Sequence, residues 1–548
     1  MVKGYHTSNM GIPSLFKKLT SQHPDLLTHT IPPGRAHVDT LYIDFNCLIH
    51  NASRNVGVDD SVLVEFESVL EHVNDEAVIV NTMVALQTMI RQVGPKHVFI
   101  ATDGPVPKAK MMKQRERRLG HTHSSPSIGS ESAGLTAFDS NAITPGTAFM
   151  EKLAERIRSC IYFQSFGCDS VIFSDYRSPG EGEQKIFDRL RACAPNDAIT
   201  HVIYGMDADL IVLSMASEHY RSIVLCREST EINDMQYMSV AKCLDLLHVS
   251  PDRRLDFVLA LMLGGNDFVP SIEFLKIRNG GWEMIHSQFV SFPHPLVRAC
   301  DNTICWEHLR QFLSSLVKLE KSTLRAQQTQ RQHRSHKPSE DIYHHGFFSD
   351  PKHPLHEQYG AQSLRSIVDR SEYYEHIFGN ADASFVRDAS RYFIAAVRWC
   401  WDYYLHGTIL SWDFYYPYIA GPRLEDVCFY LDDNNSCTET SWFETPLAQH
   451  VFTPLEQLLC VLPKRSVRLF PESVRIATED EWINPIETSF WTTHDTGVWI
   501  EPITGQKTIY SNSFLPDIQL EHAVLLADVC SDTLTESEMR RSTLEVKT

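Results

Sequence analysis

The sequence predicts an α/β protein with a mostly parallel central sheet flanked by helices. Five short runs rich in Val, Ile and aromatic residues alternate with helix-like segments, and this alternation favours a parallel sheet with helices on both faces. The predicted strands lie within residues 39–50, 97–103, 169–175, 201–209 and 222–226. The aromatic stretch 385–420 begins with helical periodicity, which predicts a buried helix and packed loop in a second, largely helical region.

The composition is that of a globular protein without a membrane span. The chain has 548 residues, of which 43% are hydrophobic and 22% charged. No apolar run approaches the ~18 residues that a span needs, and the N-terminus has no apolar signal segment. Thirteen cysteines without metal-site spacing suit a reducing, intracellular compartment.

The charge balance bears on nucleic-acid binding. Fifty Lys and Arg residues stand against 69 Asp and Glu, giving a formal net charge of −19. This argues against loose binding of nucleic acid over the whole surface, but it allows a local basic site.

Acidic residues follow the predicted strands at one edge of the sheet. Three of the five runs end on aspartate, and in parallel sheets the working residues lie at the carboxyl ends of strands. Acids two residues apart in PGEGE (179–183) and DAD (207–209) are expected to point to one side in extended or turn backbone. GGNDF (264–268) adds one more. The candidate catalytic residues and metal ligands are Asp44, Asp103, Glu181, Glu183, Asp207, Asp209 and Asp267.

Seven converging carboxylates would repel one another in a partly desolvated site unless cations are bound. Hard divalent ions with oxygen ligands fit, so Mg²⁺ is the expected cofactor and Mn²⁺ a substitute. Two such ions about 4 Å apart can activate water and stabilise the leaving oxygen of a phosphodiester. The alternative is that these acids lie on the surface without a common site.

A dense basic stretch, GPVPKAKMMKQRERR (104–118), follows Asp103 directly. A helix over 108–118 would place Lys110, Gln114, Arg117 and Arg118 on one face, which suits a terminal phosphate. The alternative is a solvated basic helix or a localisation signal. Acids that bind metal beside a phosphate pocket describe an exonuclease that works from a 5′ end.

With these motifs, the chain resembles the XRN family of 5′→3′ exoribonucleases. The resemblance covers nearly the whole chain in the family's order, and is weak across about 275–385 and 467–500. The matching stretches are MGIPSLFKKL (10–19), LYIDFNCLIHNAS (41–53), TDGPVPKAKMMKQRERR (102–118), FDSNAITPGTAFM (138–150), PGEGEQKIFDRLR (179–191), YGMDADLIVL (204–213), LGGNDFVP (263–270), WDYYLHGTILSWDFYYPYIAG (401–421), FTPLEQLLCVLPKRS (452–466) and LTESEMRRSTL (534–544).

The resemblance implies a processive, metal-dependent enzyme that degrades single-stranded RNA with a 5′ monophosphate to mononucleotides. It implies that the seven carboxylates bind metal and that Lys110, Gln114, Arg117 and Arg118 form the 5′-phosphate pocket. His50 matches an imidazole that stacks on the leading bases, a sequence-tolerant contact. Tyr510 is the nearest candidate for a later stacking residue, which the family usually supplies as Trp.

The resemblance also implies an arrangement of domains. We expect a PIN/flap-nuclease-like catalytic domain at 1–275, a variable helical or linker segment at 276–384, and a second region at 385–548 that wraps the first and completes the substrate channel. The polar stretch 319–345 reads as a linker or solvated helix and as a lineage-specific insertion. The chain looks like a near-minimal catalytic core.

The sequence departs from the family pattern at two places. Gln184 stands where the family usually has His, which should be tolerated because both glutamates remain. Nine residues precede the usual MG start.

The expected partners are RNA and RNA-decay or decapping factors, although no binding motif for such factors is visible. We expect a monomer inside the cell, in the cytoplasm slightly more than in the nucleus. Two other functions stay open: a structure-specific 5′ DNA or flap nuclease, and a catalytically silent RNA-binding scaffold. The FDSNAITPGT and SWDFYYPY stretches argue against the first, and the intact acids argue against the second.

Overall fold

The structure is a computed structural model that describes residues 12, 14–32, 37–54, 67–121, 138–229, 234–335, 368–418, 420–433, 443–478 and 517–545. It divides into two compact units, each formed by separate stretches of chain. The sheet unit comprises Asp25–Cys243, Gln449–Ser489 and Pro516–Thr548, and the helical unit comprises Met1–Pro24, Leu244–Ala448 and Phe490–Leu515. The division into domains at 1–275, 276–384 and 385–548 stays a prediction.

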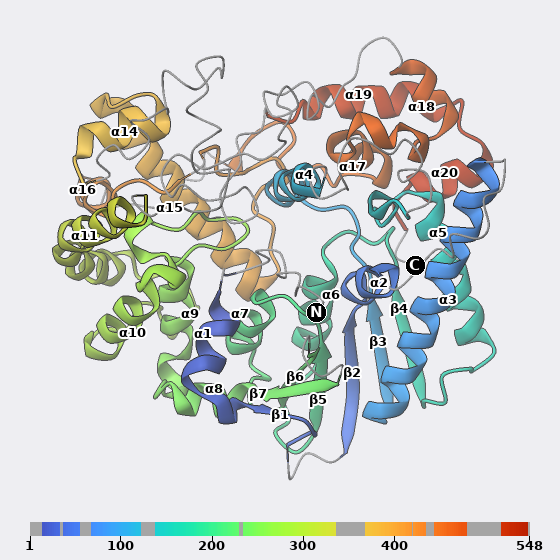
Figure 1. Ribbon diagram of the computed structural model, residues 1–548, viewed down its shortest axis with the longest axis horizontal. Helices are drawn as coiled ribbons and strands as arrows, with labels where there is room; N and C mark the ends of the chain where they lie inside the picture. The colour runs from blue at the N-terminus through green and yellow to red at the C-terminus, as the bar shows by residue number, and fades with distance from the viewer. Residues whose placement is uncertain are drawn as a thin grey trace. The chain divides into compact units, whose positions relative to one another are not determined.

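The sheet unit contains a seven-stranded mixed sheet, so the predicted fold class is confirmed (Figure 1). All five predicted strands form, and they pair in parallel: β2 with β3 and β5, β3 with β4, and β5 with β6. Two further strands, β1 and β7, add antiparallel pairs beside β6. The sheet order is β1-β7-β6-β5-β2-β3-β4. The strands are β1 Leu27–Thr28, β2 Val38–Asp44, β3 His97–Ala101, β4 Ser170–Ser174, β5 Thr200–Tyr204, β6 Ile223–Glu228 and β7 Met235–Ser239.

Helices cover both faces of the sheet, as the alternation of strands and helices predicts. Leu41 and Ile43 of β2 belong to the main core cluster, together with residues of α2 (Phe45–Arg54), α3 (Glu67–Val93) and α5 (Ala148–Tyr162). Tyr42 lies between them and points to the opposite face, where its ring contacts Phe99. Helix α6 (Gly182–Arg191) packs against β2 and β3, and α7 (Asp209–Ala216) packs against β6.

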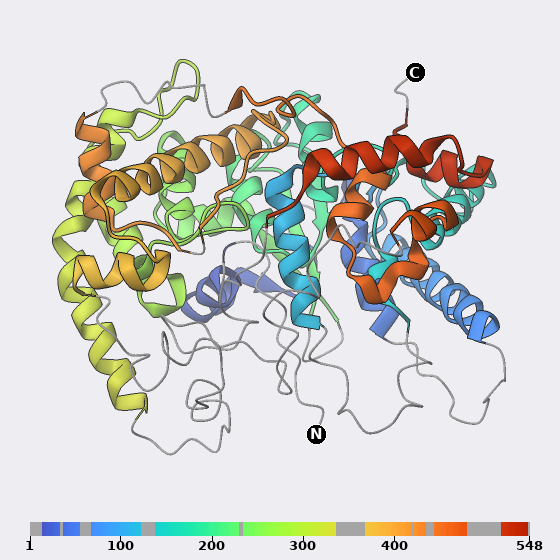
Figure 2. The same ribbon diagram turned by 90° about the horizontal axis from the view of Figure 1, so that it is seen from above.

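Helices from the C-terminal part of the chain pack into the same unit. They are α17 (Pro454–Val461), α18 (Glu472–Ala477), α19 (Leu520–Ser531) and α20 (Glu536–Ser542). Capping boxes begin α17, at Thr453 with Glu456, and α20, at Thr535 with Glu538. Helix α17 contacts α4 (Lys108–His121), and Figures 1 and 2 show the two side by side. The predicted helix over 108–118 is therefore confirmed.

The helical unit is built around the predicted aromatic helix. This is α15 (Ala383–His406), whose Trp399, Tyr403 and Tyr404 are buried, and it ends at Gly407 with a φ of 67°. Among its described residues, the unit also contains the α-helices α1 (Leu15–Gln22), α9 (Arg254–Met262), α10 (Gly281–Ser291), α11 (Trp306–Ser335), α14 (Arg370–Phe378) and α16 (Leu424–Asp433). Helix α8 (Val240–Leu246) crosses the division. No helix in the described residues is both long and apolar enough to cross a membrane.

Of the two alternatives for 319–345, a linker or a solvated helix, the structure shows a helix as far as Ser335, but one side of this helix is buried. This part belongs to α11, which packs against α16. Glu320 is buried and accepts hydrogen bonds from Arg423 Nε and Leu424 N, both at 3.0 Å. Leu324 is also buried. The low apolar content misled the sequence reasoning because a buried ion pair supplies part of this interface.

A buried histidine gives the sheet unit a predicted pH dependence. His201 of β5 is 3% exposed, and its ring contacts those of Tyr42 and His219. Burial, and then the neighbouring His219, lowers the pKa of His201 from 6.5 to about 4. The folded protein therefore keeps this ring neutral.

We expect the stability contributed by neutral His201 to be complete above pH 6.5 and to be lost as the pH falls toward 4, by about 3 kcal/mol. Urea unfolding of wild type and His201→Leu across this pH range measures it. The variant should lose less unfolding free energy on acidification than wild type. Parallel pH curves for the two proteins would contradict the assignment.

Candidate active site

Three adjacent strands deliver aspartates to one edge of the sheet. Strands β5, β2 and β3 are neighbours and run parallel, so their carboxyl ends lie together. Asp44 is the last residue of β2. Asp103 follows two residues after β3 ends, and Asp207 follows three residues after β5 ends. The strand-end argument from the sequence therefore places these three residues at one edge.

The start of α6 lies against two of these aspartates. The Gly182 N–H donates to Asp103 Oδ1 at 2.8 Å. A Cβ atom at position 182 would lie 3.1 Å from Asp44 Oδ1 and 3.0 Å from the Ala101 carbonyl, so glycine permits this close approach. Glu181 occupies the N-cap position of α6, in extended backbone, and Glu183 lies in the first turn. The two glutamates thus flank a helix start, whereas the sequence reasoning expected both in extended or turn backbone.

The charges of the cluster act on one another. Burial raises the pKa of Asp44 well above its usual range, and the charges of Asp103 and Asp207 raise it further. Burial likewise raises the pKa of Glu183, with further contributions from Glu181 and Asp207. Lys110 opposes the shift at both groups. These mutual effects show that five of the predicted acids share one electrostatic environment.

The remaining two predicted acids have different positions. Asp209 begins α7, is fully buried, and donates its N–H to Asp207 Oδ1 at 3.2 Å. Its charge also raises the pKa of Glu183, so it belongs to the same cluster. Asp267 is 8% exposed and lies in the helical unit, after α9. Its place among the metal ligands stays a prediction.

The donor set of the cluster suits a hard divalent cation. All six clustered side chains offer carboxylate oxygens, which Mg²⁺ and Mn²⁺ prefer. The raised pKa values of Asp44 and Glu183 show how costly it is to ionise these acids together without a cation. As the side chains stand, no three His, Cys, Asp or Glu residues in the described ranges form a ready metal cage. Glu181 is instead paired with the ammonium of Lys110.

The basic stretch forms α4, which starts beside the cluster. Lys108 and Lys110 lie in its first turn, where the helix dipole disfavours positive charge. Acids offset this cost: Lys108 Nζ lies 2.9 Å from Asp517 Oδ1, and Lys110 pairs with the buried Glu181. The helical spacing places Lys110, Gln114, Arg117 and Arg118 on one face, as expected. Arg118 Nη2 donates to Thr144 Oγ1 at 2.8 Å.

Two loops that carry the acids are joined by backbone hydrogen bonds. The Gly104 N–H donates to the Gly180 carbonyl at 2.8 Å, and the Gly180 N–H donates to the Pro105 carbonyl at 2.7 Å. A Cβ atom on Gly104 would lie 1.8 Å from the Ser178 carbonyl oxygen, so only glycine fits there. Buried Lys185 adds a bridge, because its Nζ donates to the carbonyls of Thr102 and Asp175, both at 2.8 Å.

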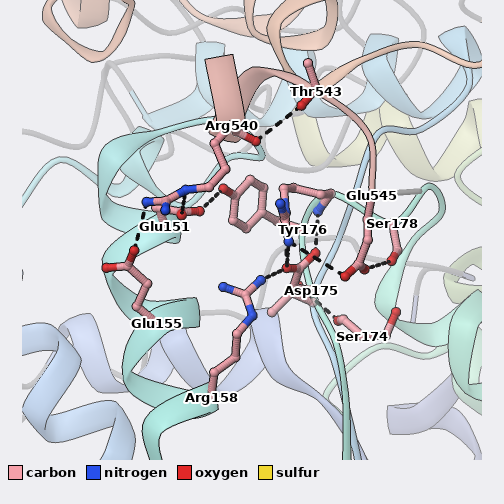
Figure 3. A network of polar contacts seen from close by, with 12 residues as sticks. Glu151, Glu155, Arg158, Ser174, Asp175, Tyr176, Ser178, Arg540, Thr543 and Glu545 are labelled. Atoms are coloured by element: carbon pink, nitrogen blue, oxygen red, sulfur yellow. Dashed lines mark hydrogen bonds and ion pairs between the residues drawn. The ribbon is translucent and has the colours of Figure 1, made fainter. Parts of the chain in front are cut away.

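The C-terminal helix α20 and the residues after it support the loop that leads to Glu181 (Figure 3). Arg540 Nε lies 2.8 Å from Glu151 Oε1, and Tyr176 donates its hydroxyl to the other oxygen of Glu151. Ser178 Oγ donates to Glu545 Oε2 at 3.0 Å, and the Glu545 N–H donates to the Arg177 carbonyl at 3.2 Å. Glu545, the residue directly after the LTESEMRRSTL stretch, thus contacts the segment just before PGEGE.

Several supporting residues were missed by the sequence reasoning. Asn46 accepts the Asp103 N–H on its Oδ1 at 3.1 Å. Lys185 and Gln457 are also new, although both lie within stretches quoted for the family resemblance. The signal for Lys185 was its position in PGEGEQK, next to two acids. Nothing local to residue 457 indicated a contact with α4.

Of the two predicted stacking residues, the structure describes only His50. His50 is half-buried on α2, and its role stays a prediction. Tyr510 lies outside the described residues. Gln184 is buried on α6, where its Oε1 accepts from Arg191 Nη2 at 3.2 Å, so glutamine is accommodated at this position.

Buried acids at the ends of parallel strands, beside a basic helix, are the arrangement expected of a nuclease domain. Comparison with protein families gives the same answer. Residues 10–229 match the model described as XRN 5′-3′ exonuclease N-terminus, and residues 369–547 match the Xrn1 helical domain. The chain belongs to the XRN family.

Two relatives illustrate the extent of the similarity. The chain is 27% identical over 552 residues to human 5′-3′ exoribonuclease 1, covering 84% of this chain and 31% of that protein. It is 25% identical over 638 residues to 5′-3′ exoribonuclease 1 of Saccharomyces cerevisiae, covering 86% of this chain and 40% of that protein. The chain therefore spans well under half the length of these relatives.

Among solved structures, flap endonuclease-1 from Methanococcus jannaschii matches 48% of this chain and 74% of its own, with a TM-score of 0.29 and 12% identity. A TM-score this low does not establish a common fold.

Proposed function

We propose that this chain is a processive 5′→3′ exoribonuclease that degrades single-stranded RNA with a 5′ monophosphate to mononucleotides. The observation that carries the proposal is Lys110. Its ammonium pairs with Glu181, and its charge acts on Asp44 and Glu183, while the same side chain begins the basic face of α4. One residue thus connects the acids expected at the cleavage point with the cations expected to hold the terminal phosphate. Membership of the XRN family supports the same activity.

Divalent cations, when bound by the carboxylates, would supply Lewis-acid activation of water and of the phosphodiester. Asp44, Asp103, Glu181, Glu183, Asp207 and Asp209 would hold two Mg²⁺ ions, with Mn²⁺ as a substitute, and we propose Asp267 as a further ligand. The Gly182 N–H orients Asp103, and the Asp209 N–H orients Asp207. These fixed acceptors keep the carboxylates aimed at one place before substrate arrives.

The face of α4 would bind the 5′ phosphate and set the register of the RNA. Arg117 and Arg118 offer planar, multiple N–H donors that match phosphate oxygens. A group that fills this face leaves the first phosphodiester near Lys110 and the acids, which explains release of one nucleotide at a time. His50 would stack on the leading bases and Tyr510 on later ones, since stacking accepts any base.

We propose further that the protein acts as a monomer in RNA turnover inside the cell, alongside RNA-decay or decapping factors, with cytoplasm favoured slightly over nucleus. Sedimentation of the purified chain tests the oligomeric state.

One experiment tests the proposal by removing the divalent cation and by changing the group at the 5′ end of the substrate. One RNA sequence is prepared with a 5′ monophosphate or a 5′ hydroxyl, and the same sequence is prepared as DNA. We expect Mg²⁺ to support rapid loss of the monophosphorylated RNA alone, EDTA to stop it, and added Mg²⁺ to restore it. Equal cutting of all three substrates would indicate a general nuclease. No cutting in Mg²⁺ or Mn²⁺ would contradict catalysis.

A further inference from the structure

Gln457, in the C-terminal part of the chain, contacts Gln114 on helix α4, which carries the predicted phosphate-binding face. Gln457 lies on α17 and is fully buried. Its Oε1 accepts the Val106 N–H at 2.9 Å, just before α4 begins. Its Nε2 donates to Gln114 Oε1 at 3.1 Å. All three residues lie in the sheet unit, although more than 340 residues separate Gln114 from Gln457.

The direction of these hydrogen bonds is fixed by chemistry. A backbone N–H can only donate, so the atom of Gln457 that faces Val106 must be the amide oxygen. The NH₂ group of Gln457 must then face Gln114 and donate. Gln114 must accept with its own oxygen, and its NH₂ group is left on the opposite side.

As a result, helix α4 presents the two N–H groups of the Gln114 side-chain amide as hydrogen-bond donors. Gln114 is half-buried, and none of the described residues accepts a hydrogen bond from its Nε2. Helical spacing puts Gln114 on the face that carries Lys110, Arg117 and Arg118. Donors on this face suit phosphate oxygens, whereas an amide oxygen turned the same way would repel them.

We propose that Gln457 is a positioning residue that locks the Gln114 amide with its NH₂ group toward the 5′ phosphate. The proposal rests on the proposed function, because it needs α4 to bind that phosphate. It adds a new element to the site: the end selectivity of the enzyme depends on a side chain from the C-terminal region that never touches RNA. Without this lock, Gln114 could present its oxygen to the substrate.

Gln457→Glu is the sharpest variant. A carboxylate keeps the shape and accepts from Val106 N–H, but it cannot donate to Gln114. Gln114 would then turn its NH₂ group inward. Because the side chain at position 457 is fully buried, burial raises the pKa of the new carboxyl, and the ionised form is reached at pH values above that pKa. We expect the ratio of kcat/KM for 5′-monophosphate over 5′-hydroxyl RNA to fall roughly ten- to a hundred-fold, mainly through a higher KM for the phosphorylated RNA.

The pH dependence of end selectivity distinguishes a positioning role of residue 457 from a general loss of structure. A protonated carboxyl has an O–H donor and can take the place of the amide. The selectivity of Gln457→Glu, divided by that of wild type at each pH, should therefore rise as the pH falls through the pKa of the new carboxyl. Gln457→Met, which cannot donate and accepts only weakly, should show a reduced selectivity without this pH dependence.

Two further variants complete the test. Gln114→Met removes the oriented group, and Gln457→Glu added to it should cause no further loss of selectivity. Gln327→Glu puts an acid at another buried glutamine, in the helical unit, and should lower the melting temperature without changing selectivity.

The outcomes are distinguishable. If Gln114→Met keeps the full preference for a monophosphate, the phosphate pocket itself is wrong. If Gln114→Met loses the preference and Gln457→Glu keeps it, the positioning role is wrong while the proposed function stands. Equal losses on phosphorylated and hydroxyl RNA in Gln457→Glu would also overturn the positioning role.

Discussion

Replacing Asp207 with alanine is expected to lower the turnover of 5′-monophosphorylated RNA by on the order of 10³-fold, because a lost cation ligand removes several kcal/mol of transition-state stabilisation. Asp207 interacts electrostatically with two other acids of the cluster, since its charge raises the pKa of Asp44 and of Glu183. Single-turnover kinetics measure the effect. The fold should survive, since the residue is only half-buried.

The Asp207→Asn variant removes the negative charge of residue 207 while keeping the size and shape of its side chain. Asparagine keeps an oxygen that can accept the Asp209 N–H, so this hydrogen bond at the start of α7 is kept. Asp188→Asn on the exposed side of α6 serves as control and should keep wild-type turnover. A readout independent of activity is the rise in melting temperature on adding Mg²⁺, which should be clear in wild type and strongly reduced in Asp207→Asn. Near-normal turnover in either Asp207 variant would contradict the assignment of Asp207 as a ligand of the catalytic cations.

The Arg117→Ala Arg118→Ala double variant is expected to have the second largest effect. It removes two guanidinium groups from the predicted phosphate-binding face, and each charge-assisted hydrogen bond is worth about 1.5–3 kcal/mol. The preference for a 5′ monophosphate over a 5′ hydroxyl should fall by about 10²-fold, with hydroxyl RNA cut at nearly the same rate as before. Competition between the two RNAs in one tube measures this ratio directly.

Lys108→Met is the matched control for this experiment. Lys108 is also a cation of α4, but it is engaged by Asp517. We expect it to change stability more than end preference. If the arginine double variant keeps the wild-type ratio, the phosphate is bound elsewhere and the account of α4 fails.

The sequence predicted the parallel strands better than the antiparallel edge formed by β1 and β7. Strands β2, β3, β5 and β6 show Val, Ile and aromatic runs because most of their residues are buried. Strand β4, at the opposite edge, is exposed or half-buried but still carries the run VIF. Strand β1 has only two residues, and β7, with the sequence MQYMS, has neither an apolar run nor clean alternation. Their antiparallel pairing depends on neighbours that no local pattern reveals.

The candidate site was predicted to the extent that topology determines it. Asp44, Asp103 and Asp207 could be placed together because parallel strands deliver their ends to one edge. The pairing of Lys110 with Glu181 could not be foreseen, because it depends on how closely α6 approaches α4. The contacts of Gln457, Arg540 and Glu545 with this region join residues hundreds of positions apart, and sequence periodicity carries no information about such contacts.

The most direct measurement is a timed digest, in Mg²⁺, of one single-stranded RNA with a 5′ monophosphate and a label at its 3′ end. The account predicts that full-length RNA disappears without a ladder of shortened labelled fragments, while the label appears only in the final short product. A ladder of shortened 3′-labelled fragments from the first time points, or a 5′-labelled copy of the RNA that is shortened from its 3′ end, would contradict a processive 5′→3′ exoribonuclease.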